Sequence, residues 1–539
     1  MSKQHIDKGS DAVSVDQYNP GIERQEDESF LRYVGRRLVS RTSVDGMISD
    51  SKAGNLKRNL NAFHLTCLGV GSIIGSGIFV YSGTVAATNT GPAVVISFIL
   101  AGFVAALSAL CYSEIASMIP AAGSAYSYTY ATMGEFVAWL VGWMLILEYM
   151  VGTAAVGVGW SGYLIRFFHD AFGITLDKRF IGAFVEFKEA GTVEFPDQRF
   201  FLTGNYCNLP AIAVIMTLTV MLILSTRQSA TFTAVIVVLK VTIIFIFIFG
   251  SVDKIQPSNW EPFFPPAQTD YYGHFGTMGI FKGASVLFFC YVGFDAVATT
   301  ALEAKNPKRD LPISIISSLT ISTLLYIAVA LVMCGIASYT ELNVAQPITI
   351  AIGFINRPWL GILVGLGAVI GMSTTMIGNM VAMSRVFFSM SNDGLIPRFF
   401  GKVHPSYRTP YISQAIVGTF ASILAAMFPV DVLGELTGMG TLFGFCLVCL
   451  GTMILRIKRP DLPPWIQGSL WALCHSAYGG CFLCWTHLHI LQLGTPSAFD
   501  LDSYRRCRLL LLRVPPVQNK PPRQVYRFCS GRYYSCPLA

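Results

Sequence analysis

Long apolar segments recur along this chain, and they restrict its fold more than any other feature. A helix that crosses a bilayer needs about 20 apolar residues. We predict ten such spans, with approximate limits 61–88, 92–118, 134–164, 209–226, 230–251, 279–302, 312–337, 357–390, 412–429 and 432–455. Only 13% of the residues are charged, whereas soluble domains are about a quarter charged. The sequence therefore predicts an all-α polytopic membrane protein, because helices satisfy their own backbone hydrogen bonds in lipid.

The polar ends of the chain set its expected orientation. Residues 1–58 hold no long apolar run and no secretory signal, so we expect a cytoplasmic amino-terminal tail before a membrane core at 59–460. The connections after spans six and eight are then cytoplasmic. They are rich in Lys and Arg, as the positive-inside rule requires. The net charge of +7 fits this topology better than nucleic-acid binding.

The first span contains the stretch GVGSIIGSGIFV from Gly69 to Val80. Each glycine costs a helix interior roughly 0.5–1 kcal/mol relative to alanine, and this stretch has four. Two interpretations compete. The glycines allow close helix packing, or they mark a broken helix whose freed backbone lines a binding cavity.

The sixth span favours the broken helix. It reads FFCYVGFDAVATTALEAKNPKRDLP and places Gly293 and the ionisable Asp295 among aromatic residues. Interruptions at matching places in spans five apart indicate an inverted-repeat transporter site.

Five motifs in order resemble the amino acid–polyamine–organocation transporters, in particular the cationic amino acid transporter branch. They are GVGSIIGSGIF, CYSEIASMIPAAGSAYSYTY, LILEYMVGTAAVGVGWSGYL, the sixth-span stretch, and RVFFSMSNDGLIPRFFGKVHPSYRTP. The resemblance covers about 56–463. It implies a five-plus-five inverted repeat of the LeuT-like kind, with an amino acid held between broken spans one and six.

An α-amino acid carries a carboxylate and an ammonium, and main-chain groups of the broken spans suit both. The amides of Ser76, Gly77 and Ile78 begin the second half of span one, where the helix dipole favours an anion. The ammonium is expected at the carbonyls. The expected substrate-binding residues of the two breaks are Ile73, Ile74, Gly75, Ser76, Gly77, Ile78, Phe289, Cys290, Tyr291 and Gly293. By resemblance Phe289 is an aromatic gate; the alternative is an ordinary packed phenylalanine.

Lys240 is alone in the apolar fifth span. A charged ammonium in mid-bilayer is costly, so it either pairs structurally or is a protonatable group that replaces a sodium ion. In proton-coupled transporters that resemble this chain, a lysine here approaches the break in span one. We therefore expect proton coupling through Lys240, although a facilitator keeps such a lysine as a fixed charge.

Further polar residues in the spans are candidates for specificity or gating. Glu148 either bonds a neighbouring helix or meets a cationic substrate side chain, and the resemblance places Asn379 near the same pocket. Asp295 is expected to steady the broken helix, with capping of the half-helix amides as the structural alternative. Glu114 is expected to serve the cytoplasmic gate or helix packing, and Arg385 is expected to reach the cytoplasmic interface and pair with an acid.

The resemblance stops near Pro463. From 461 to 539 the chain holds no well-formed span, only a weak candidate at 468–494 for an eleventh or twelfth. We interpret this segment as either a shifted reading frame or a diverged regulatory tail.

The sequence favours a secondary transporter of amino acids, with arginine, lysine or ornithine ahead of neutral substrates. The alternatives are a broad-specificity neutral permease or facilitator and a non-transporting amino-acid sensor. No catalytic residues, cofactor or metal site are expected, since there is no Walker motif, nucleophile elbow or paired C-x-x-C. The plasma membrane is the expected location, and a vacuolar or lysosomal membrane is the alternative.

Overall fold

The computed structural model describes residues 41–47, 60–121, 123–175, 177–187, 200–224, 230–267, 274–344, 346–405, 407 and 409–462. These residues all belong to the unit Met1–Gln492. Most of the expected amino-terminal tail lies outside the described residues. The segment from 463 onward does too, including the weak span candidate at 468–494 and the question of a shifted frame.

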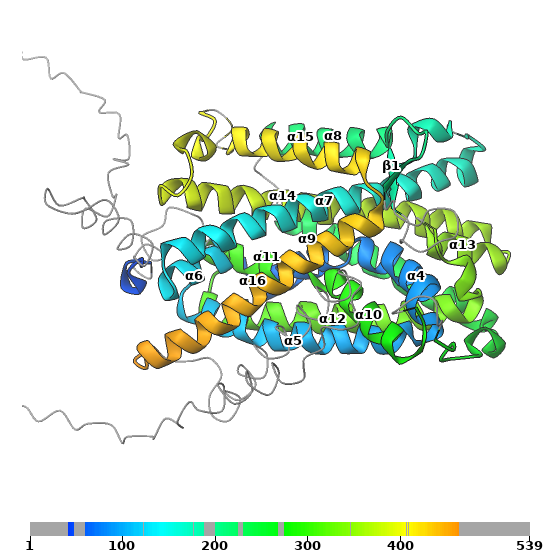
Figure 1. The fold of residues 1–539 in the computed structure, drawn as a ribbon, viewed down its shortest axis with the longest axis horizontal. Coiled ribbons are helices and arrows are strands. Elements are labelled where there is room, and N and C mark those ends of the chain that lie inside the picture. Colours follow the sequence, from blue (N-terminus) through cyan, green and yellow to red (C-terminus); the bar gives the residue numbers. More distant parts are fainter. Residues whose placement is uncertain are drawn as a thin grey trace, which may run out of the picture. The chain divides into compact units, whose positions relative to one another are not determined.

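Helices form nearly all of the described chain (Figure 1). The uninterrupted long ones are α5 (Val94–Met118), α7 (Glu135–Phe172), α8 (Leu209–Leu224), α9 (Ala230–Ser251), α12 (Pro307–Ile336), α14 (Pro358–Asn392), α15 (Tyr411–Met427) and α16 (Val430–Lys458). A two-stranded antiparallel hairpin, β1 (Val185–Phe187) and β2 (Phe200–Leu202), follows α7. The prediction of a helical architecture is confirmed.

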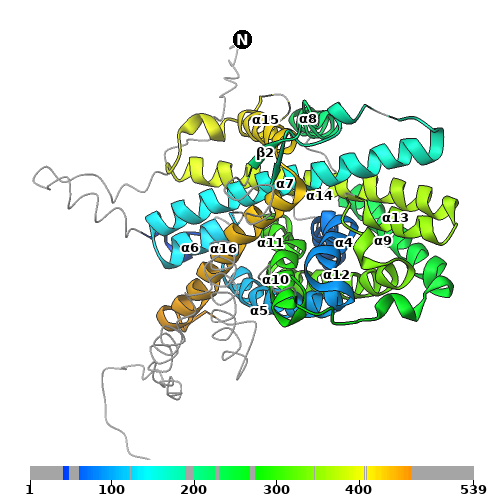
Figure 2. The same cartoon turned by 45° about the vertical axis from the view of Figure 1, so that its right-hand side comes forward.

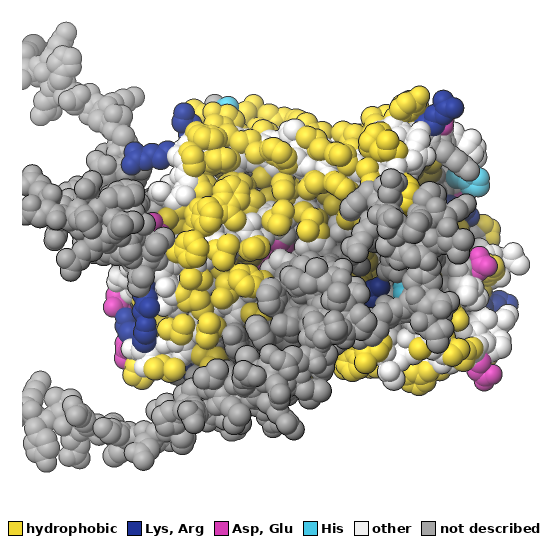
Figure 3. Space-filling model, in the orientation of Figure 1, with side chains coloured by type: hydrophobic (Ala, Val, Ile, Leu, Met, Phe, Trp, Pro, Cys, Tyr) yellow, Lys and Arg dark blue, Asp and Glu magenta, His cyan; other side chains and the backbone are white. Residues whose placement is uncertain are grey.

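Within the described residues, seven helical segments are long and apolar enough to cross a membrane, judged by length and composition. Three shorter apolar helices, Ala62–Ile73, Leu209–Leu224 and Tyr411–Met427, accompany them. Hydrophobic side chains cover much of the described surface in Figure 3, with Lys and Arg gathered toward the two ends of the helices. The multi-pass membrane character therefore agrees with the sequence, while the arrangement of ten spans stays a prediction.

The first span is broken. Helix α3 (Ala62–Ile73) stops where Ile74 leaves the helical region at ψ 87°, and a second helical segment begins with η2 (Gly77–Tyr81), α4 (Ser82–Val85) and η3 (Ala86–Thr90). Two of the glycines permit close contacts at the break: a Cβ on Gly75 would lie 2.8 Å from Thr375 Cγ2, and one on Gly77 would lie 2.6 Å from Cys290 Cβ. No side chain fits there without displacing its neighbour.

The sixth span is broken at the matching place. Helix α10 (Gly276–Phe288) continues into the 3-10 turn η8 (Phe289–Tyr291), and a new helix α11 (Phe294–Thr299) follows. Between them Gly293 adopts a φ of +125°, which side-chain-bearing residues rarely adopt. A Cβ there would also lie 2.8 Å from the Ser72 carbonyl carbon. The two breaks therefore pack directly against each other.

Four of the five pairs of expected spans that lie five apart pack side by side; the exception is α9 with α16, spans five and ten, which are not in close contact. The pairs α5 with α12, α7 with α14 and α8 with α15 are in contact, and both views of the ribbon show them next to one another (Figure 2). The broken spans follow the same rule, because α3 contacts α11 and η2 contacts η8. This pairing is what two five-helix halves facing each other would produce.

Some elements differ from the sequence prediction. Helix α7 runs to Phe172, eight residues beyond its expected end, because no Gly or Pro intervenes until Gly173, whose left-handed φ of +69° ends it. The short helix α6 (Ala125–Thr132), between the second and third spans, and α13 (Pro347–Phe354), before α14, were not predicted. Each has only eight residues, too few for a periodic signal.

Candidate functional site

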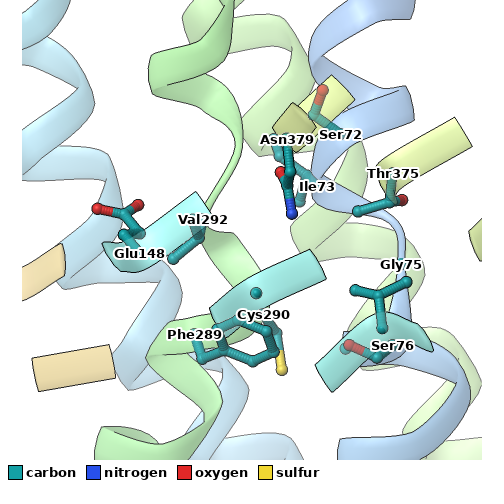
Figure 4. Close-up of a pocket in the computed structure, with 13 residues that line it drawn as sticks. Ser72, Ile73, Gly75, Ser76, Glu148, Phe289, Cys290, Val292, Thr375 and Asn379 are labelled. Atoms are coloured by element: carbon teal, nitrogen blue, oxygen red, sulfur yellow. The ribbon is translucent and has the colours of Figure 1, made fainter. Parts of the chain in front are cut away.

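A buried pocket lies where the two breaks meet (Figure 4). Its cavity volume is about 20 Å³, room for about one water molecule and far below the roughly 300–1,000 Å³ of small-molecule sites, so the pocket is closed to an amino acid in this conformation. Its lining residues are Ser72, Ile73, Gly75, Ser76, Gly77, Glu148, Gly152, Val156, Phe289, Cys290, Val292, Thr375 and Asn379.

Of the twelve expected substrate-binding residues, eight line the pocket, and Ile74, Ile78, Tyr291 and Gly293 do not. The four absent residues lie in the same two breaks, next to residues that do line it. Sequence reasoning missed five lining residues: Ser72, Gly152, Val156, Val292 and Thr375. Gly152, Val156 and Val292 are small or apolar, and Ser72 and Thr375 carry only a hydroxyl. Nothing in their local sequence distinguishes them from packing residues.

The second half of span one presents its first amides at the pocket. Gly77 and Ile78 open η2, and the first N–H groups of a helix have no acceptor within it. Ser76, which precedes them, is 1% exposed and lines the pocket with Gly77. The arrangement is suited to a carboxylate.

The carbonyl groups at the end of α3 already have partners. The Ile73 oxygen accepts from the Tyr326 hydroxyl at 2.8 Å and from the Gly75 amide at 2.9 Å. The Ile74 oxygen accepts from Thr375 Oγ1 at 3.2 Å and from the Lys240 ammonium at 2.8 Å. In this conformation, both carbonyl oxygens that would bind a substrate ammonium already accept hydrogen bonds from the protein.

Lys240 is 1% exposed and reaches the break from α9. Its Nζ donates to the Gly71 and Ile74 carbonyl oxygens, both at 2.8 Å, and to Thr374 Oγ1 at 3.3 Å. All three acceptors are neutral. An ammonium has three N–H donors for them, whereas a neutral amine has only two, so loss of the proton would release one contact at the break.

Glu148 lines the pocket from α7 and is 2% exposed. Neither carboxylate oxygen has a hydrogen-bond partner among the described residues. Thr441 lies beside this carboxylate, but its hydroxyl donates to the Thr437 carbonyl oxygen instead. A buried carboxylate without a donor is costly, so this group is placed to receive a cationic or donor group from a ligand.

Asn379 enters the pocket from α14, and Figure 4 places it at the end where Ser72 and Ile73 lie. A Cβ on Gly152, one turn after Glu148, would lie 3.3 Å from Asn379 Nδ2. Asn379 and Glu148 therefore flank the same turn of α7.

Phe289 and Cys290 line the other end of the pocket, near Ser76 (Figure 4). The Phe289 ring packs edge-on against Tyr81, with ring centroids 5.1 Å apart. The neighbouring Tyr291 turns away from the pocket and donates to the Phe98 carbonyl oxygen at 2.8 Å. Phe289 thus lines the pocket, whereas Tyr291 fastens η8 to α5.

Asp295 is fully buried and braces the break in span six. Its Oδ1 accepts from the Gly293 amide at 3.1 Å, and its other oxygen accepts from the Tyr149 hydroxyl of α7. These contacts tie the backbone at Gly293 to α7.

Glu114 and Arg385 lie in polar contacts away from the pocket. Glu114 on α5 pairs with Arg456 on α16 and is fully buried. Arg385 on α14 pairs with Glu303 at 2.7 Å and donates to Thr299 Oγ1 at 3.2 Å. The first pair joins α5 to α16 across 342 positions of the chain, and the second joins α14 to the connection after α11.

The described residues contain no group of three or more His, Cys, Asp or Glu side chains that could hold a metal ion.

A family model described as amino acid permease matches residues 60–494 of this chain. The match covers all the helices described above and extends past Pro463, where the motif resemblance ended.

Individual relatives agree with this family. The chain is 40% identical to a methylthioribose transporter of Bacillus subtilis (strain 168) over 425 residues, which are 79% of this chain and 87% of that protein. It is 39% identical to a branched-chain amino acid permease of the same organism over 428 residues, again 79% and 87% of the two chains. A vacuolar cationic amino acid transporter 4 of Arabidopsis thaliana is 36% identical over 436 residues, 80% of this chain and 69% of that protein.

Proposed function

Because this chain belongs to the amino acid permease family, we propose that it is a secondary active transporter that carries cationic amino acids across a membrane in symport with protons. The transported amino acid binds between the broken first and sixth spans, which belong to two inverted five-helix halves. The contacts between spans five apart support that arrangement. Transport, rather than catalysis, is the activity that the family implies.

In this proposal the substrate carboxylate is held at the amides of Ser76, Gly77 and Ile78. The substrate ammonium displaces the uncharged Tyr326 hydroxyl from the Ile73 carbonyl, while protonated Lys240 keeps the Ile74 carbonyl. Phe289 closes over the bound amino acid. The helix dipole at η2 stabilises the carboxylate, and the tight approach of Gly77 to Cys290 keeps the two breaks together.

The single observation that carries the coupling is the contact of Lys240 with the Gly71 and Ile74 carbonyls. The ammonium holds the break in its present shape through three donors. When the proton leaves, one of these contacts is lost and the break is free to rearrange. Protonated Lys240 thus holds the break in the shape that binds substrate, so binding of the proton and binding of the substrate favour each other.

The preference for a cationic side chain rests on Glu148, whose carboxylate lines the pocket and accepts no hydrogen bond from the residues that the structure describes. Arginine, lysine and ornithine each bring a cation that would satisfy it. Cationic amino acid transporters among the relatives agree with this choice.

A neutral amino-acid permease is the second candidate, since one relative is named as a branched-chain amino acid permease. The apolar side chains of Val156 and Val292 also line the pocket.

Uptake of radiolabelled arginine and leucine into proteoliposomes that contain the full chain tests both candidates. Accumulation of arginine above its outside concentration, driven by an inward proton gradient and inhibited by lysine and ornithine, is the expected result. Accumulation of leucine alone would favour the neutral permease. Saturable arginine binding without any uptake would contradict transport and would favour an amino-acid sensor on the same scaffold.

The relatives do not fix the membrane in which the protein acts. We propose the plasma membrane with a cytoplasmic amino terminus, and the vacuolar relative keeps an internal membrane as the alternative.

A further inference from the structure

We propose that the Tyr81 hydroxyl is a latch that keeps the pocket closed on the side of η2, and that it must release before substrate enters or leaves there. This inference rests on the proposed transport function and assigns a gating role to a residue outside the pocket itself.

Tyr81 is the last residue of η2 and is 1% exposed. Its hydroxyl donates to the carbonyl oxygen of Val430, the first residue of α16, at 2.5 Å. The two residues are 349 positions apart in the chain. The bond therefore ties the second half of span one to the beginning of the last described helix.

The same side chain supports Phe289, the residue proposed above to close over the bound amino acid and called the lid from here on. Its ring packs edge-on against Phe289, with centroids 5.1 Å apart. Phe289 and Ser76 lie at the same end of the pocket in Figure 4, and η2 leads away from Ser76 toward Tyr81. For Phe289 to move off the pocket, the Tyr81 ring behind it must move too.

Helix α16 is shaped to receive this ring. Gly434 lies one turn after Val430, and a Cβ there would come within 2.6 Å of ring carbons Cε1 and Cζ of Tyr81. Glycine is the residue that leaves room for the ring at this distance. Tyr81 thus contacts the lid on one side and α16 on the other. Its hydroxyl bond to Val430 holds the ring in this position.

The side chains around the pocket are nearly all buried in this conformation, including Cys290 at 2% exposure. Cys290 lines the pocket beside Phe289, at the same end. Its reactivity therefore reports how often the lid opens.

The test compares Tyr81→Phe with the unchanged chain, both full length and in proteoliposomes without substrate. Modification of Cys290 by a small charged methanethiosulfonate is followed over time by mass spectrometry of the peptide that contains it. Removing the hydroxyl keeps the ring but deletes the bond, so we expect modification to become roughly two- to tenfold faster, the ratio that corresponds to one hydrogen bond. A rate equal to that of the unchanged chain would overturn the proposal.

Two further variants sharpen the comparison. Gly434→Ala displaces the ring from the α16 side and is expected to accelerate modification as well. Ser97→Ala removes another buried hydroxyl bond, from α5 to the Ile280 carbonyl of α10, and is expected to leave the rate unchanged. Equal acceleration in Ser97→Ala would show general loosening and would also overturn the proposal.

Thermal unfolding midpoints of the variants establish that each is folded. Because the thiol measurement needs neither substrate nor flux, a failure of arginine uptake in the unchanged chain would contradict the proposed function and leave the latch standing.

Discussion

The ammonium nitrogen of Lys240 lies 2.8 Å from the carbonyl oxygen of Ile74, a residue 166 positions earlier in the chain. The same nitrogen binds the Gly71 carbonyl, and Thr375 Oγ1 binds both of these carbonyls from α14. Three helices therefore meet at one break in the membrane core. A change at any one of them reaches the pocket through the backbone of span one.

Replacement of Glu148 by glutamine is expected to reduce the affinity for arginine at least about tenfold, because a charge-assisted hydrogen bond to the substrate is lost. The affinity for leucine should change little, since leucine offers no cation to this carboxylate. Competition of each unlabelled amino acid against a labelled substrate gives both values. An equal loss for both amino acids would contradict a role in side-chain recognition.

Replacement of Gly293 by alanine is expected to destabilise the protein by about 1–3 kcal/mol, because the backbone there has a φ of +125° and the new methyl group meets the Ser72 backbone. Transport should fall with it, since the two breaks no longer pack closely. Gly440→Ala is the matched control, because a Cβ at Gly440 has no atom within 4 Å. Thermal unfolding in detergent compares the two, and equal midpoints would refute this account of the break.

Replacement of Arg456 by methionine is expected to cost about 3–5 kcal/mol, the cost of breaking a buried ion pair from one side. It removes the cation that contacts the fully buried Glu114 carboxylate. The double variant Glu114→Gln, Arg456→Met should recover part of this loss, because the buried charge is then gone. A double variant whose loss equals the sum of the losses of the two single variants would show that the two residues are not coupled.

The break in span one was predictable from sequence because glycines at Gly75 and Gly77 are unusual in an apolar helix, and the second break because Gly293 and Asp295 interrupt span six. The glycines turned out to divide between two tasks. Gly69 packs against Ser318 and Gly71 against Val237, as the close-packing interpretation required, whereas Gly75 and Gly77 lie at the break.

What the sequence did not reveal were contacts made across long distances in the chain. Tyr326 binds the Ile73 carbonyl from 253 positions away, and Tyr81 binds Val430 across 349. A tyrosine within an apolar helix is predicted to be a packing residue, because neither its spacing nor its neighbours indicate which group its hydroxyl will bond to. The Ile73 and Ile74 carbonyls accept hydrogen bonds from such distant residues. The sequence therefore could not predict that these carbonyls already have donors within the protein.

Proton movement that accompanies arginine uptake tests the central claim most directly. Proteoliposomes that enclose a pH-sensitive dye receive arginine outside, with either the unchanged chain or Lys240→Met. The account predicts that arginine acidifies the interior with the unchanged chain. Lys240→Met should give no acidification, although exchange of arginine across the membrane continues. Arginine accumulation with undiminished acidification in Lys240→Met would contradict coupling through this lysine.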